Sequence, residues 1–470
     1  MSTQRIALPE VDDDVNGVVN ALVGKLDGHR RTNRHLDAYY DAEKNLRKMH
    51  GGVVPEQYYR LGLVLGWSAK AVDGLGRRCN LDRMVWPDGT LDDYGYAEVW
   101  DGNRLESETD QAITDALVHG LAFAVASKGD KGEPAGLVHF YSAADATGER
   151  NARTRRLDNL LVVRDRDQQR NVSALTLYLD GETIAAMRGD GGRWEIVDRS
   201  EHTFGVPAAP LVYRPRLRRP MGRSRLTRPI RGLQDAAARA LVRLEGHMDI
   251  YAYPEFWMLG ADPSIFKNPD GSPMAEWQQR LGRIKGIPDD KDLEDTPELA
   301  RADVKMFAAA SPEPHLKALN AYAKLYAREA SLPDSAVAIS DLTNPTSAES
   351  YDAAQYELVA EAEGAVREFA PALRHVIPIA MAMQSDLAEV PDAWRSIDTK
   401  WRDPRFLSRA AEADAGSKQL SAVPWLAETE IGLELLGLDE QQIKRALGER
   451  RRAQANARLD AVIAAARDGA

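Results

Sequence analysis

The sequence predicts an α+β fold that is mainly α, with one β-rich unit set among long helices. Apolar residues recur at helical spacing over most of the chain, which indicates amphipathic helices. Between about residues 118 and 216 this pattern gives way to short apolar runs broken by Gly and Asp, which indicates strands and turns. Two amphipathic segments then flank a mixed region at 254–311.

Composition limits the classes of protein to which the chain can belong. Its 470 residues suffice for two to four domains, and 44% are hydrophobic, so a globular core is expected. The formal net charge of -11 argues against a protein that grips nucleic acid with its whole surface. A single cysteine, Cys79, excludes a disulfide framework or a cysteine cluster for a metal. No signal peptide and no membrane span are expected.

Residues 15–85 are predicted to be mostly helical. Val19, Leu22, Val23 and Leu26 repeat at helical spacing, and Pro55 is a favourable first residue for a later helix. The β-rich unit follows, and its "GDGGR" at 189–193 has the composition of a hairpin turn.

A long helix is predicted after the β-rich unit, ending near Tyr253-Pro254 because the residue before a proline disfavours helix. Its apolar stripe consists of Leu226, Ile230, Leu233, Ala237, Leu241 and Leu244. After the mixed region, Ser311 is a plausible N-cap of a second amphipathic helix. We expect the stripe to pack against Leu316, Leu319, Tyr322, Leu325 and Tyr326 of that helix.

A very long helix is expected from about residue 347, with possible kinks at Pro371 and Pro378. Residues 400–470 are predicted to be mostly helical, with breaks at Gly416, Pro424 and Leu438-Asp439. Between the second amphipathic helix and the very long one lies the small-residue stretch "PDSAVAISDLTNPT".

Catalytic motifs are absent from the sequence. It contains no phosphate-binding G-x-x-x-x-G-K-[ST], no H-E-x-x-H, no C-x-x-C and no G-x-S-x-G. The nine histidines are scattered singly, and the acidic run at 289–298 lacks the spacing of a calcium loop. We therefore expect no catalytic residue, no cofactor and no metal.

The strongest charge feature is a short arginine-rich segment. Its members are Arg214, Arg216, Arg218, Arg219, Arg223 and Arg225, followed by Arg228 and Arg231. Arginine forks suit phosphates, so one interpretation is contact with DNA. The alternative is a salt-bridge network with the excess acid, within one chain or between subunits.

Several segments, taken in order, resemble the portal proteins of tailed bacteriophages, in the branch common among phages of actinobacteria. They span nearly the whole chain, and the ordered set is more specific than any one motif. The segments are "NRHLDAYYDAEKNLRKM", "PEQYYRLGLVLGWSAKAVDGLGRR", "MGRSRLTRPIRGLQDAAARALVRLEG", "ASPEPHLKALNAYAKLYAREASLPDSAVAISDLTNPTSAESYDAAQYELVAEAEG" and "WRDPRFLSRAAEADAGSKQL".

The resemblance implies a structural ring, usually a dodecamer, at one capsid vertex of the virion. Viral double-stranded DNA would pass through its channel during packaging and ejection. The expected partners are the terminase large subunit, head-completion or adaptor proteins, and capsid and scaffolding proteins, with assembly in the host cytoplasm and no membrane. The alternatives are another ring-forming head or connector protein, or an enzymatic packaging subunit.

The resemblance also implies a division of the chain. The expected regions are a wing at 1–221, a first stem helix at 222–253, a clip at 254–311, a second stem helix at 312–332, a tunnel loop at 333–346, a long wing helix at 347–385 and a crown at 386–470.

Two sets of residues are expected to face the channel. The tunnel-loop residues are Asp334, Ser335, Ala336, Val337, Ser340, Asp341, Thr343 and Asn344. The possible channel charges are Lys317, Lys324, Arg328, Arg239 and Arg243. For the loop the alternative is a plain helix–helix connector, and for the charges it is ion pairing between subunits.

Overall fold

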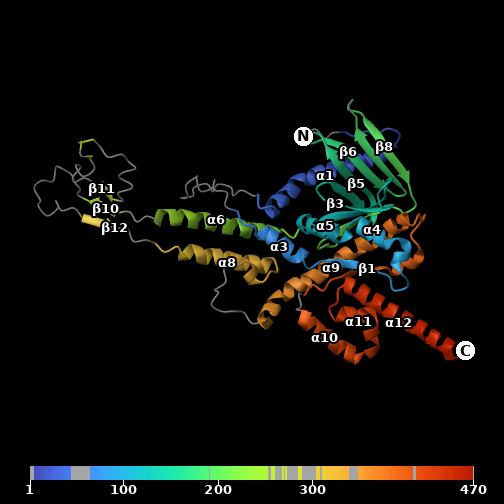
Figure 1. Cartoon of the computed structure of the whole chain (residues 1–470). Coiled ribbons are helices and arrows are strands. Elements are labelled where there is room, and N and C mark those ends of the chain that lie inside the picture. The colour runs from blue at the N-terminus through green and yellow to red at the C-terminus, as the bar shows by residue number, and fades with distance from the viewer. Residues whose placement is uncertain are drawn as a thin grey trace, which may run out of the picture. The chain divides into compact units, whose positions relative to one another are not determined.

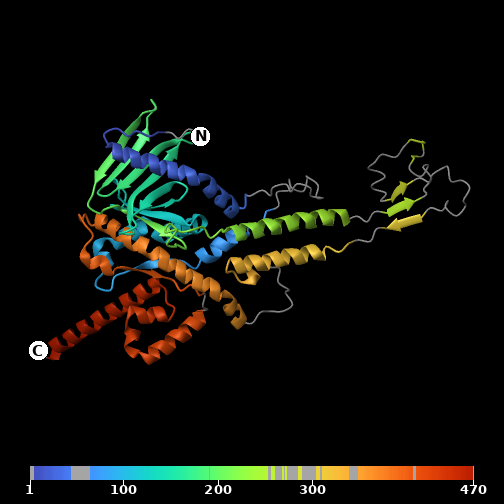
Figure 2. The ribbon, with the colours of Figure 1, turned by 180° about the vertical axis from the view of Figure 1, so that it is seen from behind.

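The structure is a computed structural model of the full chain (Figures 1 and 2). The residues that it describes are 5–43, 64–189, 191–251, 256–259, 267–268, 270–272, 284–287, 303–306, 310–337, 348–405 and 409–468. The chain divides into two compact units, Met1–Arg402 and Asp403–Ala470, which are described separately. The predicted α+β architecture is confirmed, with helix predominating.

A five-stranded antiparallel sheet with a helix across one face forms the first layer of the larger unit. The helix is α1 (Asp13–Tyr40), and the strands, in sheet order, are β4 (Ala146–Arg150), β5 (Leu157–Arg166), β6 (Val172–Leu179), β7 (Glu182–Arg188) and β8 (Trp194–Glu201). Val19 and Leu22 of α1 pack on Leu161 and Leu177 of the sheet. The turn predicted at 189–193 connects β7 to β8, as expected.

A three-stranded antiparallel sheet lies against the other face. Its order is β3 (Gly136–Ser142), β2 (Leu121–Lys128), β9 (Ala208–Val212). Phe123 and Val125 of β2 pack on Leu160 and Tyr178 of the larger sheet. The β-rich unit predicted at about 118–216 is therefore confirmed as two layered sheets.

Helices enclose the three-stranded sheet and form the main core with it. These are α3 (Trp67–Gly76), η1 (Leu91–Tyr94), α4 (Tyr96–Gly102), α5 (Leu105–His119) and the long α9 (Ala348–Gln384). Helix α9 contains Pro371 and Pro378 inside its length, and its buried Phe369, Leu373 and Ile377 face the sheet.

A two-stranded sheet joins distant parts of the larger unit. Strand β1 (Leu81–Val85) pairs antiparallel with β13 (Asp398–Trp401), next to η5 (Asp392–Ser396). The prediction of helix up to residue 85 is wrong at β1, because its partner strand lies about 300 residues away. The pairing also places residues 386–402, expected in the crown, within the larger unit.

Two antiparallel helices leave the β-rich unit side by side (Figures 1 and 2). They are α6 (Arg228–Tyr251) and α8 (Glu313–Glu329), the predicted stem helices. In the stretch of sequence that connects α6 to α8, β10 (Phe256–Leu259) pairs parallel with β11 (Ile284–Ile287) and antiparallel with β12 (Asp303–Met306). These strands are the described part of the predicted clip.

The C-terminal unit is helical, as predicted, and its helices break near Pro424 and Leu438-Asp439, as expected. The break predicted at Gly416 is wrong, because Gly416 lies inside a helix and serves close packing. The unit contains α10 (Arg409–Ala422), η6 (Pro424–Glu428), α11 (Glu430–Leu435) and α12 (Glu440–Asp468). Two buried glycines permit the close packing of its first three elements: a Cβ on Gly416 would lie 1.8 Å from the Leu435 carbonyl oxygen, and one on Gly432 would lie 2.0 Å from that of Leu426.

Candidate functional site

The surface of the paired helices carries most of the predicted channel charges. Lys317, Lys324 and Arg328 of α8 are exposed, as is Arg243 of α6, whereas Arg239 is half-buried. Lys317 pairs with Glu313 one turn earlier at 2.9 Å, with both side chains mostly exposed. Such a pair contributes little to stability in water, so these cations remain available to a partner.

The apolar contact between the helices is partly as predicted. Leu226, Ile230 and Ala237 are buried on α6, and Tyr326 is fully buried on α8. Leu233, Leu241, Leu244, Leu319 and Tyr322 are half-buried.

Leu316 and Leu325, however, are 41% and 50% exposed, so the prediction that they pack against α6 is wrong within one chain. Leu325 directly precedes Tyr326 and therefore points about 100° away from the buried face. Leu316 lies beside the His247–His315 ring contact, close to the end of α6, where little of that helix is left to cover it.

The predicted tunnel loop begins with a short 3-10 turn, η4 (Asp334–Ala336). Asp334 and Ser335 are exposed, whereas Ala336 and Val337 are half-buried against the main core. The remaining predicted loop residues, Ser340, Asp341, Thr343 and Asn344, lie outside the described residues.

The "GRS" at residues 222–224, at the start of the predicted first stem helix and just before α6, is explained by close backbone packing. Gly222 has φ +73°, and a Cβ there would lie 2.5 Å from the carbonyl oxygens of Gly120 and Tyr213. The Ser224 hydroxyl accepts a hydrogen bond from the Leu226 amide at 3.0 Å, in the manner of a cap. These contacts fix the direction in which α6 leaves the β-rich unit.

Arg225, the last arginine of the predicted cluster, lies at the centre of a buried network. Its guanidinium donates to the Ala71 carbonyl of α3 at 2.9 Å and to the Tyr213 hydroxyl at 2.9 Å. It also donates to the Ala330 carbonyl at 2.6 Å, which satisfies a C-terminal carbonyl of α8. An ion pair with Glu361 of α9 completes the set. One side chain, just before α6, thus joins the C-terminal end of α8 to α3, to the residue that follows β9, and to α9.

The electrostatics keep this network charged. Burial alone would lower the pKa of Arg225, but Tyr213 and the Glu361 carboxylate raise it above its ordinary value. Burial also raises the pKa of the Tyr213 phenol, which therefore stays protonated and donates to Glu361. The Arg225 side chain is only 2% exposed and therefore has no access to DNA. For this arginine, the interpretation as part of a salt-bridge network within one chain is confirmed.

The other arginines of the cluster occupy two environments. Arg214 pairs with the same Glu361 oxygen at 2.7 Å, lies over the Tyr213 ring, and donates its backbone N–H to Glu368 at 2.7 Å. The exposed members of the predicted cluster are Arg216, Arg218, Arg219 and Arg223. The structure therefore does not bring the six arginines together as one basic patch.

Sequence reasoning missed Glu361 and Tyr213, the partners that determine the role of Arg225. A signal was present at Glu361, because it stands three residues after buried Leu358 and four before buried Ala365. A carboxylate on that stripe requires a buried cationic or hydroxyl partner.

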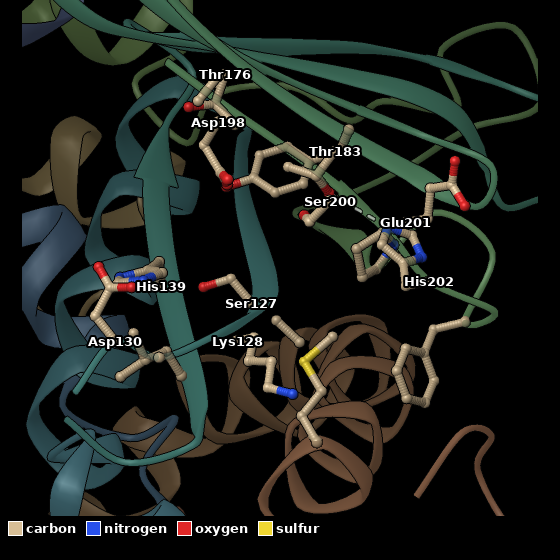
Figure 3. A pocket seen from close by; sticks show the side chains of 18 of the residues that line it. Ser127, Lys128, Asp130, His139, Thr176, Thr183, Asp198, Ser200, Glu201 and His202 are labelled. Carbon is tan, nitrogen blue, oxygen red and sulfur yellow. Dashed lines mark hydrogen bonds between the residues drawn. The ribbon is translucent and has the colours of Figure 1, made fainter. Parts of the chain in front are cut away.

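An inter-sheet pocket of about 960 Å³ opens between the two sheets, next to the C-terminal end of α9 (Figure 3). Thr183, Ser200 and His202 lie across it from Ser127 and Lys128. Within the described residues, no cluster of side chains could hold a metal ion. No described helix is long and apolar enough to cross a membrane.

Comparison with known proteins identifies the family. The family described as "Phage portal protein, SPP1 Gp6-like" matches residues 24–456. The chain belongs to this family. The portal protein of Mycobacterium phage L5 is 28% identical over 388 residues, covering 81% of this chain and 77% of the relative. The portal protein of Mycobacterium phage D29 is 26% identical over 404 residues, covering 84% and 80%.

Solved structures resemble the chain more distantly. The "Neck of empty GTA particle computed with C6 symmetry" is 16% identical with a TM-score of 0.43, covering 85% of this chain and 97% of that one. The "Virion of native gene transfer agent (GTA) particle" is 15% identical with a TM-score of 0.38, covering 87% and 99%. The assignment rests on the family match, which makes the chain a structural component of a portal ring in a phage particle.

Proposed function

We propose that the chain forms the ring, most simply a dodecamer, through which viral double-stranded DNA is packaged and ejected at one capsid vertex. The family match over residues 24–456 carries this proposal. The pair of long helices, held at its base by Arg225, supplies a stiff wall for a channel.

In this proposal the exposed face of α8 borders the channel. Lys317, Lys324 and Arg328 would meet passing phosphates or the acidic groups of a neighbouring subunit. Twelve copies at -11 each carry -132, so the whole ring binds duplex weakly. Weak net attraction suits a conduit, because DNA must slide through it.

The loop at 333–346 would project toward the DNA with small side chains. Asp334 and Ser335 are exposed at its start, and Ser340, Asp341, Thr343 and Asn344 continue it in the sequence. Short polar side chains leave room for a duplex and offer it few contacts. Ala336 and Val337 are half-buried against the main core and would not project.

The proposed partners are the terminase large subunit during packaging, then head-completion or adaptor proteins, with capsid and scaffolding proteins around the ring. Assembly would take place in the host cytoplasm. We assign the chain no catalytic activity of its own, since its sequence carries no phosphate-binding or hydrolase motif and the buried network around Arg225 joins structural elements.

Electron microscopy and native mass spectrometry of the purified chain test this function. We expect closed rings with an axial opening that admits a duplex. A stable monomer at every salt concentration and pH would contradict the proposal. Nucleotide turnover by the purified chain that a point substitution abolishes would contradict the non-enzymatic assignment.

A further inference from the structure

Residues 215–220, "PRLRRP", form an exposed, rigid turn shortly after Tyr213, which is a partner of Arg225 in the buried network. The contacts within the chain assign this turn no role. We name it the Leu217 turn. The Arg216 amide donates to the Arg219 carbonyl at 3.0 Å, and the Arg219 amide donates back at 2.7 Å, which closes a two-residue hairpin. Prolines at both ends restrict the backbone further.

The base of the Leu217 turn is held by the core. Arg214 is anchored by Glu361 and Glu368, and Gly222 packs against the Tyr213 carbonyl. A turn fixed in this way loses little conformational entropy when it docks against a partner.

The side chains of the Leu217 turn indicate that it binds a partner outside its own chain. Leu217 is fully exposed, at 103%, which is more than any other exposed large apolar side chain of the described residues. Among the described residues, no carboxylate pairs within 4.0 Å with Arg216, Arg218 or Arg219. The turn therefore presents one apolar side chain among three unpaired guanidiniums.

The inter-sheet pocket is acidic and thus complementary in charge to the Leu217 turn (Figure 3). Its carboxylates are Asp130, Glu133, Asp198, Glu201 and Asp386, against the cations Lys128 and Arg164. Burial lowers the pKa values of His139 and His202 in the same pocket, so both are neutral at pH 7 and the cavity is acidic.

The pocket also has exposed apolar side chains in its lining. Met187 of β7 is 47% exposed and Val197 of β8 is 63% exposed, and both line the cavity with Phe204 and Leu387. β8 is the edge strand of its sheet, so no further strand pairs with it among the residues that the structure describes. The volume of about 960 Å³ exceeds what one leucine and neighbouring arginine side chains require.

We propose that the Leu217 turn of one subunit docks into the inter-sheet pocket of the next subunit, with Leu217 against Met187 and Val197 and its arginines beside the carboxylates that line the pocket. This inference rests on the proposed ring and adds a contact that holds it together. The Leu217 turn and the inter-sheet pocket are different surfaces of one chain, so the contact is head-to-tail, and such contacts give a ring when the rotation between subunits closes. Burying Leu217 contributes about 1.5–3 kcal/mol, and the charge pairs select the partner and the register.

A cysteine pair tests the contact directly. Leu217→Cys and Ser200→Cys are placed in one chain, where Ser200 lines the pocket (Figure 3). Both positions are exposed, so the fold is not disturbed, and native Cys79 is fully buried and does not compete. Under mild oxidation we expect a ladder of disulfide-linked oligomers up to the full ring, since the contact would bring the two Cα atoms within about 7 Å.

The matched controls are the two single-cysteine variants, neither of which forms a ladder. Rings that assemble normally but give no ladder from the paired variant would overturn the inference and leave the ring proposal intact. Absence of rings in the unmodified protein would instead refute the proposed function.

A charge exchange provides a second, independent test. Arg218→Glu is expected to raise the protein concentration for half-maximal ring assembly about tenfold, and Glu201→Arg in the same chain to reverse most of that increase. If neither Leu217→Asp nor Arg218→Glu alters assembly, while loss of the three arginines weakens DNA binding, the turn contacts DNA and the inference is wrong.

Discussion

At the scale of single residues, the Arg225–Glu361 pair is the most consequential contact in the larger unit. A buried ion pair is costly to break from one side, because the remaining charge has neither water nor a partner. Here the same guanidinium also satisfies two backbone carbonyls.

Glu361→Ala is therefore expected to lower the free energy of unfolding by about 3–5 kcal/mol, as measured by urea denaturation. The matched control is Asp392→Ala, which breaks the exposed Arg395–Asp392 pair and should cost less than about 1 kcal/mol. Similar losses in the two variants would contradict the role assigned to the network.

His375 of α9 gives the protein a residue-scale pH dependence. Burial lowers its pKa in the folded state, and its Nε2 lies 3.4 Å from the Val206 carbonyl oxygen. The unfolded chain therefore binds a proton near pH 6.5 that the folded chain binds only at lower pH. The stability conferred by His375 is present above about pH 6.5 and is lost as pH falls through the folded pKa.

His375→Gln should flatten the fall of stability below about pH 6.5 by up to about 1.4 kcal/mol per pH unit, as measured by urea denaturation at a series of pH values. His29→Gln, at an exposed position of α1, is the control and should leave the profile unchanged. Identical pH profiles for wild type and His375→Gln would show that the buried imidazole is not the cause.

At the scale of elements, the spacing of apolar residues and the turn composition predicted those features that depend on neighbouring residues in the sequence. The stripe of Leu226, Ile230 and Ala237 is buried, and the glycine-rich turn at 189–193 joins two strands. Pairing of β1 with β13 was not predictable, because nothing within β1 indicates a partner so distant in sequence.

The distinction between local and long-range determinants also explains which features of the candidate site the sequence predicted. The arginine-rich segment is visible in the sequence, yet Arg225 is buried and Arg218 is exposed, since Gly222 and the Glu361 carboxylate decide their environments. The exposure of Leu316 likewise depends on where α6 ends, which spacing alone does not specify.

The helical C-terminal unit depends on close backbone packing at Gly416. Gly416→Ala would place a Cβ 1.8 Å from the Leu435 carbonyl oxygen and force α10 and α11 apart. We expect a loss of about 1–3 kcal/mol, seen as faster hydrogen exchange in α10 and α11.

Gly448→Ala in α12 is the control, because no neighbouring atom lies within 4 Å of its Cβ position, and the added propensity should stabilise the helix by up to about 1 kcal/mol. Equal protection of α10 in wild type and Gly416→Ala would contradict the packing described here.

At the scale of the whole molecule, the net charge of -11 and the exposed cations of α8 combine to suit a conduit. In the proposed ring, repulsion of phosphates by the net negative charge would prevent tight binding, while the exposed Lys324 and Arg328 would provide local contacts with the DNA. The ring, rather than the single chain, is the functional unit in this account.

A cryo-electron microscopy reconstruction of the assembled ring tests the central claim most directly. We expect an open axial channel wide enough for a duplex, lined by the α8 face that bears Lys317, Lys324 and Arg328. A ring without an axial opening, or one in which that face of α8 lies on the outer surface, would contradict it.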